Sequence, residues 1–199
     1  MLKVGITGGI ASGKTTVCYL FEKLFQTPIY FADTRAKEII EKNDVVKNNI
    51  IELFGEQAYI NNQYNRKFIA SKVFEDKSLL QQLNQIVHPA VFEDAQQFFF
   101  NHQKDEYILY ESAIMFESKS NLLMDKIILV NASKELRIER AIKRDTLNRK
   151  EIEQRINSQI TFEAIQEKCD YIIQNDGNIN LESQIITIHQ EILNSTKKK

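Results

Sequence analysis

A glycine-rich segment near the amino terminus, GGIASGKTT at residues 8–16, has the composition and spacing of a phosphate-binding loop. Gly8 and Gly13 occupy the two glycine positions of the pattern GxxxxGK[ST], and Lys14 and Thr15 complete it. Glycines let successive backbone N–H groups converge on one anion, because they accept positive φ and carry no Cβ. We therefore expect this P-loop to bind the phosphates of a nucleoside triphosphate.

The expected contacts come from the loop backbone and from two side chains. Lys14 offers a mobile ammonium group to the β- and γ-phosphates, and the Thr15 hydroxyl is a hard oxygen ligand suited to Mg²⁺. The start of the following helix adds unpaired N–H groups and a partial positive charge. The loop residues expected to contact the nucleotide are Gly8, Gly9, Ala11, Ser12, Gly13, Lys14, Thr15 and Thr16.

The segments on either side of the loop have the pattern that such a loop needs. Residues 2–7 are typical of a short buried strand and residues 16–25 of a helix, and this order makes a chance glycine-rich turn a poor explanation. Further strands alternate with helical segments, which predicts a parallel sheet covered by helices on both faces. The expected fold is an α/β P-loop NTPase fold, with three layers and a five-stranded sheet. The other four strands are expected at residues 28–33, 107–111, 126–130 and 169–174.

Two carboxylates follow expected strands. Asp33 lies at the end of the second strand and Glu111 at the end of the third. Ligands of an open α/β sheet bind beyond the carboxyl ends of its strands, so both are expected at the same edge as the phosphate loop. Asp33 has the chemistry of a catalytic base and equally that of a helix cap, and the two roles are compatible. Glu111 could assist the metal ion.

The region between residues 43 and 103 contains helical periodicity and no convincing parallel strand. We expect a turn at residues 61–63 and a new helix that begins at His88 with Pro89 in its first position. A helical block between two sheet strands suggests an insertion that recognises the substrate. His88 could be structural or could contact that substrate.

A basic helical segment follows the fourth strand. Arg137, Arg140 and Arg144 are spaced i, i+3, i+7 and share one helix face, and residues 148–151 resemble a capping box that opens another helix through Arg155. A solvated helix held by i,i+4 ion pairs would also have this composition. Beside a phosphate loop, the segment is better interpreted as a lid whose guanidinium groups neutralise charge during phosphoryl transfer.

Composition narrows the class of protein further. The chain has 199 residues and a net charge of −1, which argues against nucleic-acid binding by bulk charge. Cys18 and Cys169 are expected to be buried, reduced thiols, and three scattered histidines form no zinc pattern. No apolar stretch is long enough for a membrane span and no secretion signal is evident, so a cytoplasmic protein is expected. We expect one domain, with a core at residues 1–42, 104–136 and 166–199, an acceptor-binding insertion at 43–103 and a lid at 137–165.

A series of short motifs extends along essentially the whole chain: residues 7–16, Ala32 with Asp33, His88 with Pro89, Phe116 with Glu117, residues 143–145, Arg155 with Gln159, and residues 175–177. With this ordered set, the chain resembles the dephospho-coenzyme A kinases. Two departures stand out: Phe31 replaces an aspartate usual in the family, and Ala113 replaces a usual proline.

The resemblance implies transfer of the γ-phosphoryl group of ATP, with Mg²⁺, to the ribose 3′-hydroxyl of dephospho-coenzyme A. This reaction gives coenzyme A and ADP and is the last step of coenzyme A biosynthesis. The implied partner is a small-molecule acceptor, without nucleic acid or membrane, for a monomer or weak homo-oligomer. The implied catalytic residues are Asp33 as the base, Lys14, Arg140 and Arg144; the adenine would lie near Asn175 and Gly177, and the acceptor near Asp33, His88 and Arg155.

Two other classes share parts of this pattern. Another small-molecule P-loop kinase, acting on a nucleoside monophosphate or on shikimate, would have the same sheet, loop and lid and would differ in the insertion. A nucleotide-dependent switch protein would bind GTP and signal through ordered loops. The chain lacks the Asn-Lys-x-Asp segment that reads guanine, which argues against the second alternative.

Overall fold

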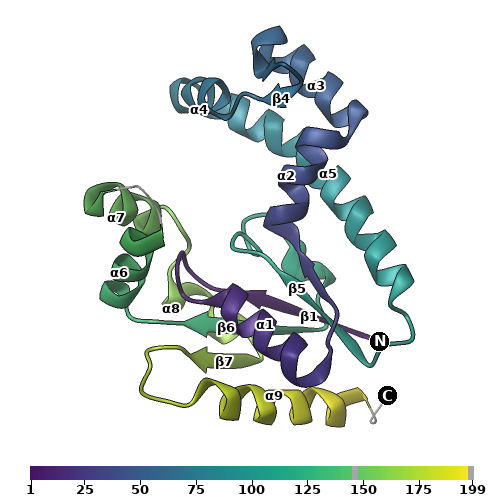
Figure 1. Ribbon diagram of the computed structural model, residues 1–199, viewed down its shortest axis with the longest axis vertical. Coiled ribbons are helices and arrows are strands. Elements are labelled where there is room, and N and C mark those ends of the chain that lie inside the picture. Colours follow the sequence, from purple (N-terminus) through teal and green to yellow (C-terminus); the bar gives the residue numbers. More distant parts are fainter. Residues whose placement is uncertain (145–147, 197–199) are drawn as a thin grey trace. The chain divides into compact units, whose positions relative to one another are not determined.

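The structure is a computed structural model that describes residues 1–144 and 148–196 (Figure 1). It contains two compact units. The core unit comprises Met1–Phe31 and His102–Lys199, and the inserted unit comprises Ala32–Asn101. Asp145, part of one motif that supports the family resemblance, lies outside the described residues.

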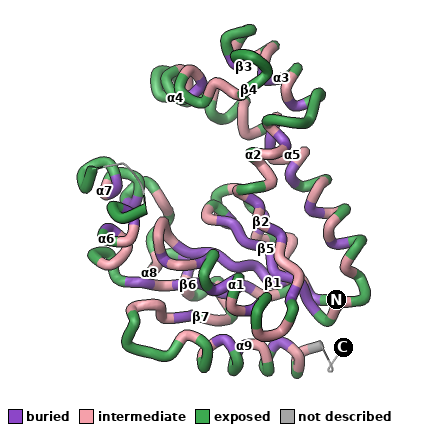
Figure 2. Tube along the Cα trace, viewed as in Figure 1, coloured by how far each residue is buried: buried purple, intermediate pink, exposed green. Residues whose placement is uncertain are grey.

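The core unit is built on a parallel sheet of five strands in the order β2-β5-β1-β6-β7. This arrangement confirms the predicted fold class. Continuous apolar runs form the central strands because both faces of a parallel sheet are buried, and Figure 2 shows β1, β5 and β6 as largely buried. The strands are β1 Leu2–Thr7, β2 Ile29–Phe31, β5 Tyr107–Glu111, β6 Lys126–Asn131 and β7 Tyr171–Gln174.

Helices α1 (Lys14–Phe25) and α9 (Leu181–Thr196) cover one face of this sheet (Figure 1). Their apolar side chains join those of alternate strand residues, such as Val4 and Ile6, in the main hydrophobic core. The opposite face is packed differently: a Cβ on Gly5 would collide with Met115, and Met124 is also close. The connection between β5 and β6 therefore lies directly against the central strand here, and a larger residue would require the Met115 side chain to shift.

The second strand is shorter than the sequence predicts. It ends at Phe31, and helix α2 (Ala32–Lys42) begins at the next residue, which places Asp33 in the first turn of that helix rather than in a strand. β2 is an edge strand, paired only with β5 in the described sheet, so few ladder hydrogen bonds oppose the start of the helix.

The inserted unit is largely helical. Within it, α2 and α5 are joined by an ion pair, in which Arg35 Nε donates to Asp94 Oδ2 at 2.8 Å. The remaining elements are α3 Asp44–Phe54, the 3₁₀ turn η1 Glu56–Ala58, β3 Tyr59–Ile60, β4 Gln63–Tyr64, α4 Arg66–Glu75 and α5 Lys77–Asn101.

The turn expected at residues 61–63 is part of an antiparallel β-hairpin, β3 with β4, that the helical periodicity did not indicate. Asn61 and Asn62 both have positive φ, 49° and 66°, as the central residues of a type I′ hairpin turn do. Two-residue strands carry too little alternation to be recognised from sequence.

The prediction that a new helix begins at His88, with Pro89 in its first position, is wrong. Helix α5 passes through Pro89 without a break. A proline inside a helix costs about 3 kcal/mol because it removes one backbone hydrogen bond and crowds the preceding turn. The buried residues Val87, Val91, Ala95 and Phe99 continue the same i, i+4 stripe on both sides of the proline, and their packing offsets that cost.

The predicted lid, residues 137–165, overlaps α6 (Lys134–Arg144) and includes α7 (Arg149–Asn157) and α8 (Phe162–Ile165); the 3₁₀ turn η3 (Gln166–Lys168) follows it. The capping box is confirmed, because the Asn148 side chain accepts from Glu151 N while the Glu151 carboxylate accepts from Asn148 N. Helices α6 and α7 share a small core of their own, formed by Ile138, Ala141, Ile152 and Ile156. Another 3₁₀ turn, η2 (Ser120–Leu123), precedes β6. No helix in the described ranges is both long and apolar enough to cross a membrane.

Acidification should destabilise the core unit through His189. Its Nδ1 lies 2.7 Å from Tyr107 Oη, and its ring stacks on Phe25 with centroids 3.6 Å apart. Burial lowers the pKa of His189 below its usual value of about 6.5, so the unfolded chain binds more protons there. The contribution of His189 is complete above about pH 6.5 and is lost as the pH falls through the folded pKa.

Thermal unfolding between pH 7.5 and 5 would measure this effect, with His189→Gln as the comparison. We expect the Tm of the variant to depend less on pH across this range. Parallel pH profiles for the two proteins would contradict the assignment.

Candidate active site

The phosphate loop follows β1, the central strand, and ends where α1 begins at Lys14. Gly8 and Gly13 have φ of 151° and 97°, and a Cβ at these positions would clash with Val130 O and Asn175 Nδ2, respectively. Ala11 has φ of 58° without being glycine. Left-handed residues between right-handed ones curve the backbone into an anion-binding nest, so the local geometry fits the predicted phosphate site.

The side chain of Lys14 lies across this loop. It is only 8% exposed, and Nζ donates to Gly8 O at 3.0 Å and lies 3.4 Å from Gly9 O. The ammonium group is thus held beside the loop by its own backbone carbonyls. Thr15 and Thr16 are exposed at the start of α1, so the hydroxyl proposed as a metal ligand is accessible.

Ser12 is buried, and its Oγ has no hydrogen-bond partner among the residues that the structure describes. Ser12 and Gly9 also line a cavity of about 590 Å³. Its other walls come from the end of β6, the start of α6 and the α7–α8 segment. The loop therefore adjoins open space on its lid side.

Asn175, predicted near the adenine, contacts both the loop and the lid. Its Nδ2 donates to Ser12 O at 2.8 Å, and its own carbonyl accepts from Arg140 Nη2 at 2.9 Å. Arg140 Nη1 is buried without a partner in the described part of the chain. The turn that follows contains Gly177, at φ 85°. The structure thus brings Asn175, Arg140 and the phosphate loop together.

Two further lid residues contact the loop, and neither was among the predicted site residues. Arg137 Nε donates to Ile10 O at 2.9 Å, and Ile10 N donates to Gln159 Oε1 at 2.7 Å. Burial lowers the pKa of Arg137, whose guanidinium packs against Gly9. The sequence did contain information that pointed to both residues. Arg137 shares the predicted arginine face of the helix, and Gln159 belongs to one of the family motifs. Their partner is a backbone group, which no side-chain pattern reveals.

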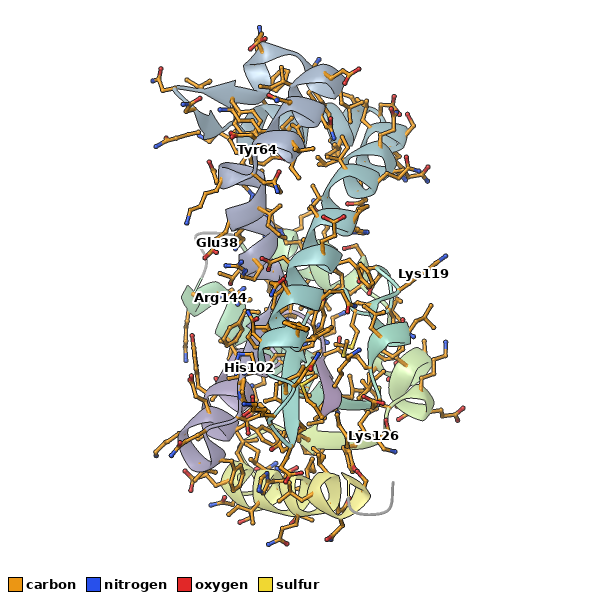
Figure 3. All side chains as sticks on the ribbon, turned by 90° about the vertical axis from the view of Figure 1, so that its right-hand side faces the viewer. Glu38, Tyr64, His102, Lys119, Lys126 and Arg144 are labelled. Atoms are coloured by element: carbon orange, nitrogen blue, oxygen red, sulfur yellow. The ribbon has the colours of Figure 1, made fainter. Side chains whose placement is uncertain are left out.

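The other lid arginines are exposed. Arg144 lies at the carboxyl end of α6, where Figure 3 labels it, and Arg155 lies on α7. Arg149 bridges the two helices, with bonds of 2.7 Å to Glu135 and 2.8 Å to Glu153. Pairs this exposed contribute little stability individually, so this bridge is a surface feature of the lid.

The remaining predicted site residues lie in the inserted unit. Asp33 is partly buried in the first turn of α2, and His88 is partly buried in the middle of α5. Desolvation lowers the pKa of His88 below its usual value, which favours a neutral ring. Asp33 follows the last residue of β2 by two positions, and β2 itself belongs to the core unit.

Glu111 is buried at the end of β5, opposite Ile6 in the adjacent β1. Together with burial, which is the larger cause, its charge raises the pKa of the Cys18 thiol. In the described residues no group of three or more His, Cys, Asp or Glu side chains could hold a metal ion.

The phosphate loop on the central strand of a parallel sheet, with an arginine-bearing helical segment bonded to it, defines the chain as a P-loop kinase. A protein-family model for dephospho-CoA kinase matches residues 2–180, and the chain belongs to that family. The dephospho-CoA kinase of Bacteroides fragilis is 35% identical over 187 residues, which cover 94% of this chain and 91% of that protein.

Solved structures agree with this assignment. A crystal structure of a Thermus thermophilus protein superimposes with a TM-score of 0.83 at 26% identity, covering 98% of this chain and 97% of that one. The dephospho-CoA kinase of Campylobacter jejuni gives a TM-score of 0.72 at 25% identity, covering 97% and 98% of the two chains.

Proposed function

We propose that this protein is a dephospho-CoA kinase, which transfers the γ-phosphoryl group of ATP to the ribose 3′-hydroxyl of dephospho-CoA. The observation that carries the proposal is a phosphate loop in a family member with its lysine already held across the loop by two carbonyls. Phosphoryl transfer needs little covalent help, so positioning and charge neutralisation account for most of the catalysis.

The loop binds the nucleotide in this proposal. Backbone N–H groups from Ala11 to Thr16 receive the phosphates, and the ammonium of Lys14 moves from the carbonyls to bridge the β- and γ-phosphates. Thr15 is the residue that would hold Mg²⁺. The bound ion would supply positive charge at the β- and γ-oxygens. The adenine lies near Asn175 and Gly177.

Arg140 and Arg144 cover the transferring group from the lid. The support is clearest for Arg140, because its buried Nη1 has no partner among the described residues and a buried, unsatisfied donor is unfavourable. A phosphate oxygen would satisfy it. An arginine in this role contributes about 10³ to 10⁵ in rate.

The residues that bind the acceptor are proposed from their positions in the chain and from the family to which the chain belongs. Asp33 is the base that receives the proton of the 3′-hydroxyl. His88 and Arg155 contact the acceptor, whose recognition we assign to the helical insertion of residues 43–103. Residues 137–165 form the lid that excludes water during transfer. In this proposal the protein has a single kinase domain and acts in the cytoplasm as a monomer or weak homo-oligomer.

A coupled ADP-release assay with Mg·ATP tests the function directly. Dephospho-CoA should support turnover, and the same concentrations of AMP and shikimate should give only the background rate of ATP hydrolysis. The product should carry its new phosphate on the 3′-position, as phosphorus NMR would show. Turnover with AMP or shikimate and none with dephospho-CoA would assign the protein to a different acceptor.

A further inference from the structure

Ile10, at the tip of the phosphate loop, is held by the lid through both of its backbone polar groups. Its N–H donates to Gln159 Oε1 and its carbonyl accepts from Arg137 Nε. Its side chain and that of Ala11 also pack against the small core of the lid. The tip of the loop is therefore attached to the lid by two hydrogen bonds and an apolar contact.

These bonds fix two peptide planes. In a planar trans peptide the C=O and the N–H point in opposite directions. With Ile10 N–H directed at Gln159, the carbonyl of Gly9 faces the loop interior, where it accepts from Ser12 N at 3.1 Å. By the same geometry, a carbonyl of Ile10 directed at Arg137 turns the N–H of Ala11 away from the lid side chain.

The conformation of Ala11 is one that contacts to the neighbouring peptides help to keep. Its φ of 58° lies in the left-handed region, which is unfavourable for a residue with a Cβ. Without Arg137 and Gln159, the two peptides could relax and redirect the N–H of Ala11. The loop would lose one donor while residues 12–16 kept theirs.

We propose that Arg137 and Gln159 are positioning residues that, by holding the two peptides of Ile10, aim the Ala11 N–H at the terminal phosphate of ATP. Docking of the lid segment therefore sets how well the loop distinguishes a triphosphate from a diphosphate. The inference rests on the proposed function for its triphosphate ligand and adds a role for two residues outside the proposed catalytic set.

The test compares two nucleotides on each variant by titration calorimetry, using ADP and a non-hydrolysable ATP analogue with Mg²⁺. Gln159→Leu removes the acceptor and Arg137→Met removes the donor while keeping an apolar stem. Each substitution should weaken binding of the ATP analogue by about tenfold or more, the effect of one lost charge-assisted hydrogen bond. The affinity for ADP should stay within about twofold of the wild-type value, because the phosphates of ADP are held by the rest of the loop.

The double variant sharpens the comparison. Both side chains act on the same residue, so their effects should not be independent. The loss of affinity for the ATP analogue in the double variant, Gln159→Leu with Arg137→Met, should be much smaller than the product of the two single losses. Arg149→Ala is the matched control, since Arg149 bonds only to Glu135 and Glu153 of the lid in the described contacts. Its affinities for both nucleotides should match the wild type.

Equal weakening of ADP and the ATP analogue, or unchanged affinity for both, would overturn the proposal. If Arg137→Met does not fold, as circular dichroism would show, Gln159→Leu alone decides the matter. Both measurements are independent of the acceptor. A protein that binds nucleotides as described but fails to phosphorylate dephospho-CoA would contradict the proposed function and leave this inference intact.

Discussion

Replacing Lys14 with methionine should reduce kcat by about a thousandfold or more while leaving the protein folded. The ammonium group is already held beside the loop by Gly8 O and Gly9 O, and no other lysine lies in the loop sequence. Methionine keeps the apolar stem of this nearly buried side chain, so the change removes charge with little loss of packing. Steady-state ADP release with saturating dephospho-CoA would measure it.

Lys23 provides the control for this substitution, because it lies on the same helix, exposed, in its last turn. Lys23→Met should leave kcat unchanged within about twofold. A Lys14→Met protein with kcat close to the wild type would end the phosphate-loop account of the reaction.

Substitution of Asp33 by asparagine should lower kcat by about 10² to 10⁴, the range expected when a general base is lost. Asparagine keeps the size of the side chain and its capacity to cap a helix, so local structure should persist. The KM for ATP should change little, because the proposed role of Asp33 is toward the acceptor hydroxyl. A full kinetic analysis with both substrates varied would separate the two constants.

Asp44→Asn is the matched control, since Asp44 also lies in the first turn of a helix of the inserted unit, α3. Both substitutions remove a negative charge near a helix amino terminus, which contributes about 0.3–1 kcal/mol at an exposed site. If Asp33→Asn and Asp44→Asn lower Tm alike and neither alters kcat, Asp33 is a helix-terminus residue and another group must be the base.

The parts of the fold that the sequence predicted are those that depend on local pattern. All five strands of the main sheet were predicted, and the central ones have the continuous apolar runs that are typical of a sheet buried on both faces. The capping box at Asn148 was identified because its two hydrogen bonds join residues three apart. In contrast, a two-residue strand such as β3 depends on its partner, and periodicity carries no trace of it.

Pro89 shows where a local rule is overridden. The rule that proline favours a helix start is correct on average, but the apolar stripe of α5 continues through it because tertiary packing decides the outcome. The site shows a similar division. The phosphate loop could be predicted from residue types alone, whereas the contacts of Arg137 and Gln159 with Ile10 depend on chain segments 127 and 149 residues away meeting one backbone group.

The inserted unit occupies the connection between β2 and β5, two parallel strands that are neighbours in the sheet. A parallel pair always needs a long crossover, and nothing in the strand register depends on what that crossover contains. Insertions, deletions and rearrangements can therefore accumulate there during evolution while the phosphate loop stays intact. Under the proposed function, in which residues 43–103 recognise the acceptor, such an arrangement lets the acceptor site diverge among related enzymes while the nucleotide site is inherited unchanged.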